Sequence, residues 1–300
     1  MLLSKAGSLC MSRIGHYHTH SDARLALGSN STYKQHSRRG CQDEQHRRTA
    51  IISHAAGTKS IRKRISDDEQ LDGGALVKYF GAVALQTGTM TGALWVLQQA
   101  SVALGEAAGE DAPRALVGLF FLVVSLRSRI FSPLDASRPT IKGEKSAIMD
   151  MRRPSWMPPP LTFPVVWSLI ALLRTISSLI IWETSGNTTL VVPLVFMMLH
   201  LSVGDCWNYI NNQEKRLGVA VPGVFACWFS CIAVVVAYYQ ADQTAGLILA
   251  PSAVWLGVAT ALITSIWTLN NNYKGQRAAL LPTKGESRAV AAAAAAAASN

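Results

Sequence analysis

Charged residues are scarce in this chain of 300 residues, because Lys, Arg, Asp and Glu make up only 15% of it while hydrophobic residues make up 49%. Soluble domains carry about 25% charged residues, so the composition excludes an ordinary soluble domain. The scarcity is uneven, since residues 1–70 are polar and basic whereas most of 74–270 is apolar. The sequence therefore predicts a polytopic membrane protein with an N-terminal extension.

The chain also lacks the usual signatures of catalysis. It contains no glycine-rich nucleotide-binding loop, no cluster of metal ligands in its apolar portion and no Ser, His and Asp that can be placed together. Its five cysteines provide no disulfide framework. Cys227 and Cys231 share a helix face, which packing of small residues in a membrane helix explains better than redox or metal chemistry. We expect no metal site and no required cofactor.

Acidic residues are nearly absent from the first 64 positions, which hold twelve Lys or Arg against three acids. Such a strip can be a nucleic-acid-binding arm, but Arg- and Ser-rich, acid-poor N-termini are typical of organelle transit peptides. We favour a transit peptide within a disordered extension over 1–70, with no nucleic-acid partner. His16, His18 and His20 alternate in this strip, and we interpret them as a fortuitous run rather than metal ligands.

Six apolar segments reach the roughly 20 residues needed to cross a hydrocarbon core of ~30 Å. They are 75–103, 113–131, 163–182, 189–210, 219–239 and 245–269. The connections 104–112, 183–188 and 240–244 hold no Lys or Arg, whereas the connections and the tail on the other side are basic. This positive-inside pattern predicts an all-α, multi-pass bundle with both termini on the basic, inner face. We expect the polar, Ala-rich tail over 271–300 to be disordered.

Three ionisable residues interrupt the third and fourth spans. At ~1.5 Å per residue, Arg174 lies about 17 Å, His200 about 15 Å and Asp205 about 8 Å from the basic face. Because helical side chains lean toward the helix N-terminus, we predict an Arg174–Asp205 ion pair with His200 stacked above it. Two roles stay open: a pair that sets the register of the helices, which we favour, or an anchor for a ligand carboxylate.

Eight tryptophans occur, and all but Trp156 lie within the predicted spans. Interfacial belts account for those near helix ends, such as Trp182 and Trp207. Trp228 and Trp255 lie about ten residues into their spans, where a belt does not account for them. They are either bundle packing or walls of an aromatic ligand site, and the sequence does not decide between these roles.

Four motifs in the apolar region occur together in one known family. The loop over 152–160 reads Arg-Arg-Pro-Ser-Trp-Met-Pro-Pro-Pro and is followed by Phe-Pro-Val-Val-Trp over 163–167. A Trp precedes the short loop to Arg-Leu-Gly over 216–218, and the fifth span ends in Ala-Tyr-Tyr over 237–239. The last span holds Pro-Ser-Ala-Val-Trp over 251–255 and Ala-Thr-Ala-Leu over 259–262. Through these motifs 113–270 resembles the TspO/MBR family of translocator proteins and tryptophan-rich sensory proteins.

The resemblance implies a five-helix domain over 113–270, preceded by the additional helix 75–103. It implies a cavity that opens toward the loop 132–162, which would be its lid. In that family the cavity takes tetrapyrroles such as protoporphyrin and haem, and in some members sterols and benzodiazepine-like drugs. The resemblance and the buried ionisable groups together give an expected ligand site, which consists of Trp156, Pro158, Pro159, Trp167, Arg174, His200, Asp205, Trp207, Trp255, Ala259 and Thr260.

We therefore expect a TspO-type membrane protein that binds tetrapyrroles as a sensor, scavenger or carrier, with no catalytic residue. One alternative is a porphyrin-degrading enzyme with Trp255 as redox participant. The other is a sterol or lipid carrier, supported by Leu269, Tyr273 and Arg277, which fit a weak cholesterol-contact pattern. The long extension and the additional helix resemble algal and plant-like relatives. We expect an organelle membrane, a plastid rather than a mitochondrion, with membrane lipids as partners and a homodimer left open.

Overall fold

The computed structural model describes residues 69–109, 111–134, 151–271 and 277–289. Within these ranges the chain is helical and forms no β-strand beyond an isolated bridge between Leu71 and Thr283. The expected all-α class is therefore confirmed. The predicted transit peptide lies outside the described residues, as does the lid segment 135–150.

Six long helices correspond to the six predicted spans. They are α2 (Gly73–Ala108), α3 (Asp111–Arg127), α4 (Thr162–Thr184), α5 (Val192–Asn208), α6 (Leu217–Ala241) and α7 (Gln243–Leu269). By length and composition, α2, α4, α6 and α7 can each cross a membrane. α3 and α5 have 17 residues each, but a 3₁₀ turn (Ser128–Phe131) prolongs α3 and a π-helical turn (Tyr209–Gln213) prolongs α5.

The helix ends follow from local side-chain chemistry. Asp72 begins α2 by accepting a hydrogen bond from the Ala75 amide at 3.1 Å. Asp242 forms the one-residue connection between α6 and α7, and it caps α7 by accepting from the Ala245 amide at 2.8 Å. These caps satisfy backbone N–H groups that the first turn of a helix leaves without partners.

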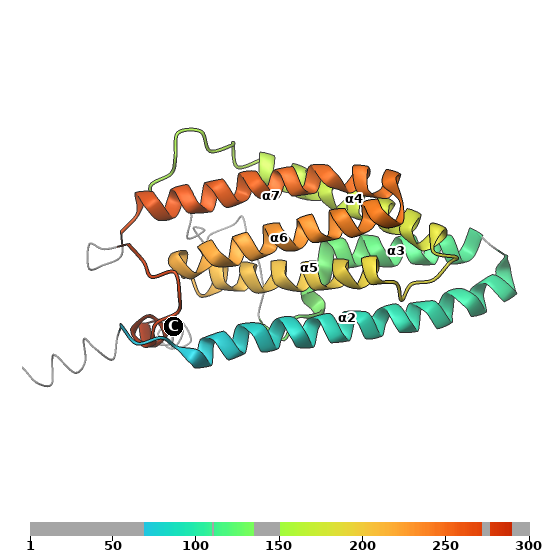
Figure 1. Cartoon of the computed structure of the whole chain (residues 1–300), viewed down its shortest axis with the longest axis horizontal. Helices are drawn as coiled ribbons and strands as arrows, with labels where there is room; N and C mark the ends of the chain where they lie inside the picture. Colours follow the sequence, from blue (N-terminus) through green and yellow to red (C-terminus); the bar gives the residue numbers. More distant parts are fainter. Residues whose placement is uncertain (1–68, 110, 135–150, 272–276, 290–300) are drawn as a thin grey trace, which may run out of the picture. The chain divides into compact units, whose positions relative to one another are not determined.

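The helices pack as a closed ring in the order α2, α3, α4, α7, α6, α5 and back to α2. The additional helix α2 thus lies between α3 and α5, and Figure 1 shows it running alongside α5. One side of α2 faces the ring through residues spaced by three or four, namely Ala75, Tyr79, Ala82, Gln86, Met90, Leu94, Leu97 and Ser101. Its opposite side exposes large apolar residues such as Val77 and Phe80, as expected of a side that faces lipid.

The C-terminal segment differs from the expected disordered tail over 277–289. The Ala278 carbonyl accepts a hydrogen bond from the Trp267 indole at 2.9 Å, and the Pro282 carbonyl accepts from the Asp72 amide at 2.8 Å. Ser287 hydrogen-bonds to the Asp72 carboxylate, which together with the Ala75 amide lowers the pKa of Asp72. The segment is ordered because its backbone pairs with the chain preceding α2, a partner that composition does not reveal.

The contact between α6 and α7 depends on a missing side chain. A Cβ atom at Gly246 would lie about 2.5 Å from the backbone of Tyr239, closer than such atoms pack. Glycine therefore lets the two backbones approach directly after their one-residue connection.

We expect Gly246→Ala to lower the free energy of unfolding by about 1–3 kcal/mol, because the added methyl group forces the two helices apart. Gly88→Ala on α2 is the matched control, since a Cβ there has no neighbour within 4 Å. The control should be neutral or stabilising by about 0.5–1 kcal/mol. Thermal unfolding in one detergent measures both variants, and equal losses would contradict the packing argument.

Candidate functional site

The described part of the predicted lid is a strap that lies along α7. At its start, the Arg152 amide donates to Asn270 Oδ1 at 2.9 Å, and Asn270 Nδ2 donates to the Arg152 carbonyl at 2.8 Å. At its end, the Phe163 ring meets Trp255 edge to face with centroids 5.9 Å apart. The segment 151–161, called the strap below, therefore runs from the end of α7 back toward its middle, where α4 begins (Figure 1). Within it Trp156 and Pro159 are exposed and Pro158 is half-buried.

An apolar groove of about 520 Å³ lies between α4 and α7, beyond the end of the strap. Its walls are Val166, Leu247, Ala250, Pro251, Val254, Trp255 and Val258. The indole Nε1 of Trp255 is buried and has no hydrogen-bond partner among the described residues. An unpaired buried N–H is costly, so the groove offers one donor to any ligand that brings an acceptor.

The two mid-depth tryptophans differ in their surroundings, which separates the roles that the sequence left open. Trp228 donates from its indole to the Ala253 carbonyl at 2.9 Å and stacks on Phe229, so it serves packing. Trp255 lines the groove. Trp167 does not join Trp255 there, because it packs against a cluster that includes Cys227 and Cys231.

The remaining aromatic and hydroxyl candidates have internal partners. Trp207 donates to the Ala220 carbonyl at 3.1 Å and thereby joins α5 to α6. Ala259 and Thr260 are buried, and the Thr260 hydroxyl donates to the Leu256 carbonyl within α7 at 2.8 Å. In the described structure these residues stabilise the bundle and do not line the groove.

Arg174 pairs with His200, not with Asp205 as predicted. Its Nη2 lies 2.8 Å from His200 Nε2, and His200 Nδ1 lies 2.9 Å from Ser230 Oγ. A guanidinium only donates, so Nε2 accepts and Nδ1 carries the proton that points to Ser230. Arg174 Nε is buried without a hydrogen-bond partner in the described residues.

Asp205 accepts instead from Gln86 Nε2 at 2.8 Å, and the same amide nitrogen lies 3.1 Å from the Ser128 carbonyl. The predicted ion pair is wrong because the expected lean of the Arg174 side chain selected the wrong residue of α5, although it selected the right helix. His200 and Asp205 are also five residues apart, which turns them about 140° from each other around α5. His200 therefore meets α4 and α6, and Asp205 meets α2.

A second polar cluster, which the sequence analysis missed, lies where α2 meets the connection between α5 and α6. Glu214 accepts from Lys78 Nζ at 3.1 Å and from the Tyr79 hydroxyl, and it pairs with Arg216 Nε at 2.9 Å. Glu214, Arg216 and Tyr79 are buried. Lys78 and Tyr79 lie 136 and 135 positions before Glu214, so no local sequence pattern predicts their contact with it. Elsewhere in the described ranges, no three His, Cys, Asp or Glu side chains are arranged to hold a metal.

Comparison with known proteins gives one family. The sequence model of the TspO/MBR family matches residues 118–268, which cover most of α3 and all of α4 to α7 but not α2. Protein CrtK of Rhodobacter capsulatus is 33% identical over 128 residues, which are 41% of this chain and 78% of that protein. The tryptophan-rich sensory protein of Cereibacter sphaeroides is 26% identical over 129 residues, 43% of this chain and 80% of its own. The human translocator protein is 28% identical over 129 residues, 42% of this chain and 76% of its own.

We expect His200→Leu to destabilise the protein by about 1–3 kcal/mol, because it leaves the Arg174 guanidinium buried without its hydrogen-bond acceptor. The double variant His200→Leu/Arg174→Met removes both polar groups and should recover part of that loss. Thermal unfolding in one detergent measures the cycle. A double variant less stable than His200→Leu alone would show that Arg174 has a separate stabilising role.

Proposed function

The chain belongs to the TspO/MBR family, and on that premise we propose that it binds a tetrapyrrole in the groove between α4 and α7. The observation that carries the proposal is the apolar groove of about 520 Å³ beside Trp255. Ligand pockets span roughly 300–1,000 Å³ and combine apolar walls with a few polar groups. A flat macrocycle suits a wall formed by Trp255, with Phe163 packed edge to face against it.

The strap supplies charge for the carboxylates of a natural porphyrin. Arg152 and Arg153 are both exposed at the start of the strap, where Arg152 is fixed to Asn270, about 18 Å along α7 from Val258 at the near end of the groove. The arginine side chains and the porphyrin propionates together have to bridge this distance. Arg174 is engaged with His200 inside the ring, so we assign the carboxylate contacts to the strap and a structural role to Arg174. Arg guanidinium groups favour carboxylates because they bind them with two parallel hydrogen bonds.

We propose a binding role, as sensor, scavenger or carrier, ahead of porphyrin degradation. The groove walls carry no acid, base or thiol; their single polar group is the Trp255 indole. Degradation would require that indole to exchange electrons with the bound macrocycle, and product analysis after illumination separates the two functions. A sterol-carrier role rests on Tyr273, which lies outside the described residues.

We further propose that the protein resides in an organelle membrane, a plastid in preference to a mitochondrion, after removal of a transit peptide. The support is the basic, acid-poor composition of the first 64 residues. The Lys and Arg residues of the basic connections support our further proposal that both termini lie on the inner face. Fusing residues 1–70 to a fluorescent protein tests whether this segment directs the protein to an organelle. A diffuse cytosolic signal would count against the proposal.

We expect protoporphyrin to quench the tryptophan fluorescence of the purified protein saturably. Trp255→Leu should weaken the affinity for protoporphyrin about tenfold or more, equivalent to about 1.4 kcal/mol. The matched control is Trp95→Leu, because Trp95 is 55% exposed on α2, outside the family-matched region. Equal effects of both substitutions would place the porphyrin elsewhere.

The charges of the two strap arginines can be tested separately from the groove. Arg152→Gln/Arg153→Gln should weaken binding of protoporphyrin, because the two propionates lose their cationic partners. The same variant should leave the affinity for the dimethyl ester of protoporphyrin unchanged, since the ester carries no negative charge. An equal loss for both ligands would show that the strap acts through its shape and not through its charge.

A further inference from the structure

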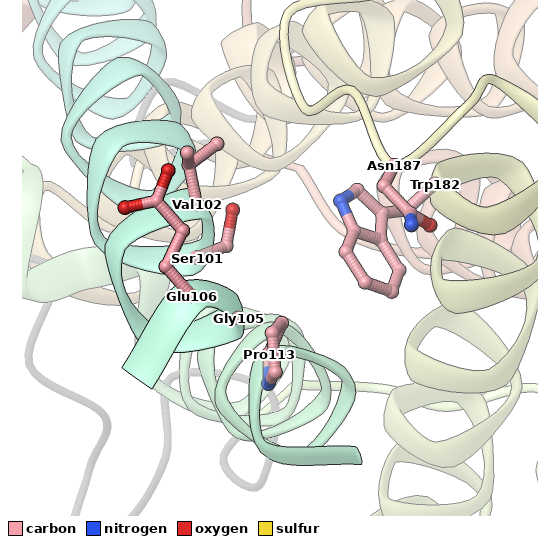
Figure 2. A pocket seen from close by; sticks show the side chains of 7 residues that line it. All are labelled: Ser101, Val102, Gly105, Glu106, Pro113, Trp182 and Asn187. Atoms are coloured by element: carbon pink, nitrogen blue, oxygen red, sulfur yellow. The ribbon is translucent and has the colours of Figure 1, made fainter. Parts of the chain in front are cut away.

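A second pocket lies where the end of the additional helix α2 meets α3 and α4. It has a volume of about 290 Å³ and lies among α2, the first turn of α3 and the last turn of α4. Ser101, Val102 and Glu106 come from α2, Pro113 from α3 and Trp182 from α4 (Figure 2). The residues of α2 and Pro113 precede the range matched by the family, whereas Trp182 lies within it, so the family model contains only one side of this pocket.

Trp182 leaves an unsatisfied donor in this pocket. Its side chain is largely buried, with 3% of the residue surface exposed, and its indole Nε1 has no hydrogen-bond partner among the described residues. Figure 2 shows the nitrogen edge of the ring turned toward Ser101 and Val102 across the pocket. The Ser101 hydroxyl donates to the Gln98 carbonyl at 2.9 Å and makes no hydrogen bond to the indole, so the indole N–H has no acceptor among the described residues. A buried N–H without an acceptor is costly, which favours an occupant that brings one.

The charges around the pocket define that acceptor. Its walls contain Glu106 and no Lys or Arg. A carboxylate or phosphate would therefore meet a negative charge, while Arg114, next to Pro113 in the sequence, is already paired with Glu183 at 2.8 Å. Most of the wall is apolar, including Val102 and Pro113. The pocket thus suits a neutral oxygen acceptor attached to an apolar body.

The position of the pocket along the membrane normal indicates which neutral oxygen acceptors are abundant near it. Trp182 lies two residues before the end of α4, and Glu106 lies two residues before the end of α2. Helix ends of this kind lie at the boundary between the hydrocarbon core and the headgroups, where tryptophan is enriched. The ester carbonyls of glycerolipids occupy the same boundary. Val102 is 52% exposed, so the pocket wall is reached from outside the bundle.

We propose that this pocket binds a neutral carbonyl oxygen carried on an apolar chain, with the Trp182 indole N–H donating to it. The acyl ester of a bilayer glycerolipid and a free small ester both have this chemistry. The site is separate from the groove at Trp255 and does not depend on the tetrapyrrole proposal. In this proposal α2 forms part of a binding site as well as part of the helix ring.

The indole N–H resonances give a direct test. The protein, labelled with ¹⁵N in its tryptophan indoles, is placed in nanodiscs of diester phosphatidylcholine or of the matching diether lipid, which lacks the carbonyls. Trp182→Phe identifies the Trp182 cross-peak by its loss. If that variant does not fold, broadening by a nitroxide on Glu106→Cys identifies the same peak. Methyl octanoate is then added to the diether sample as the free ester.

A downfield shift of the Trp182 N–H proton in diester relative to diether nanodiscs supports the proposal with lipid as the source. A shift that appears only when methyl octanoate is added supports it with a free ester as the source. An N–H resonance that is the same in all three samples, and that exchanges rapidly with water, overturns it.

A pair of substitutions on α2 locates the effect. Val102→Phe fills the exposed side of the pocket and should abolish the shift. Val96→Phe is the matched control, because Val96 is a similarly exposed valine on α2 that does not line the pocket. It should leave the shift intact. A shift that survives Val102→Phe would place the carbonyl outside this pocket and would contradict the proposal.

Discussion

The hydrogen bond from Gln86 to Asp205 joins the additional helix to the rest of the bundle, and the arrangement of the ring depends on it. Asp205 is buried in α5, where a carboxylate without a partner would be costly. α2 provides one hydrogen-bond donor to this carboxylate through Gln86, and the Glu214 cluster attaches the same helix again near its start. With α2 held between α3 and α5, the ring is closed, and α2 provides one wall of the second pocket, the one lined by Trp182. The family domain and its additional helix are therefore one structural unit in this chain.

Two of the buried polar groups without a hydrogen-bond partner among the described residues are indole N–H groups that line hollows, and these two mark the proposed sites. Others, such as Arg174 Nε, line neither hollow. Arg174, His200 and Ser230 form a chain of hydrogen bonds within the bundle that involves no ligand. Trp255 and Trp182 each keep a buried indole N–H without a partner, and each lines a hollow. Because a large buried aromatic normally finds an acceptor for its N–H, these two positions are where a ligand gains most.

Much of the fold could be predicted from the sequence, because apolar length and the distribution of Lys and Arg act locally. Those signals predict six helices and their directions, but not which helices are neighbours. Arg174 was paired with Asp205 of α5, whereas its partner is His200, five residues earlier on the same helix, because side-chain lean does not specify which face of α5 meets α4. Within the candidate site, depth singled out both Trp228 and Trp255, and the sequence could not tell which of them packs internally and which lines a groove. The unpaired indole, the internal packing of Trp167 and the ordered segment 277–289 depend on tertiary contacts that no local pattern encodes.

The account centres on the groove at Trp255 as the tetrapyrrole site, and photo-crosslinking tests this most directly. A protoporphyrin bearing a diazirine on one propionate is bound to the purified protein, activated by light and mapped by peptide mass spectrometry. The account predicts labels on the strap and on the part of α7 that lines the groove, 247–258, with excess unmodified protoporphyrin competing the labels away. Competed labels confined to α2, α3 or α5 would contradict it.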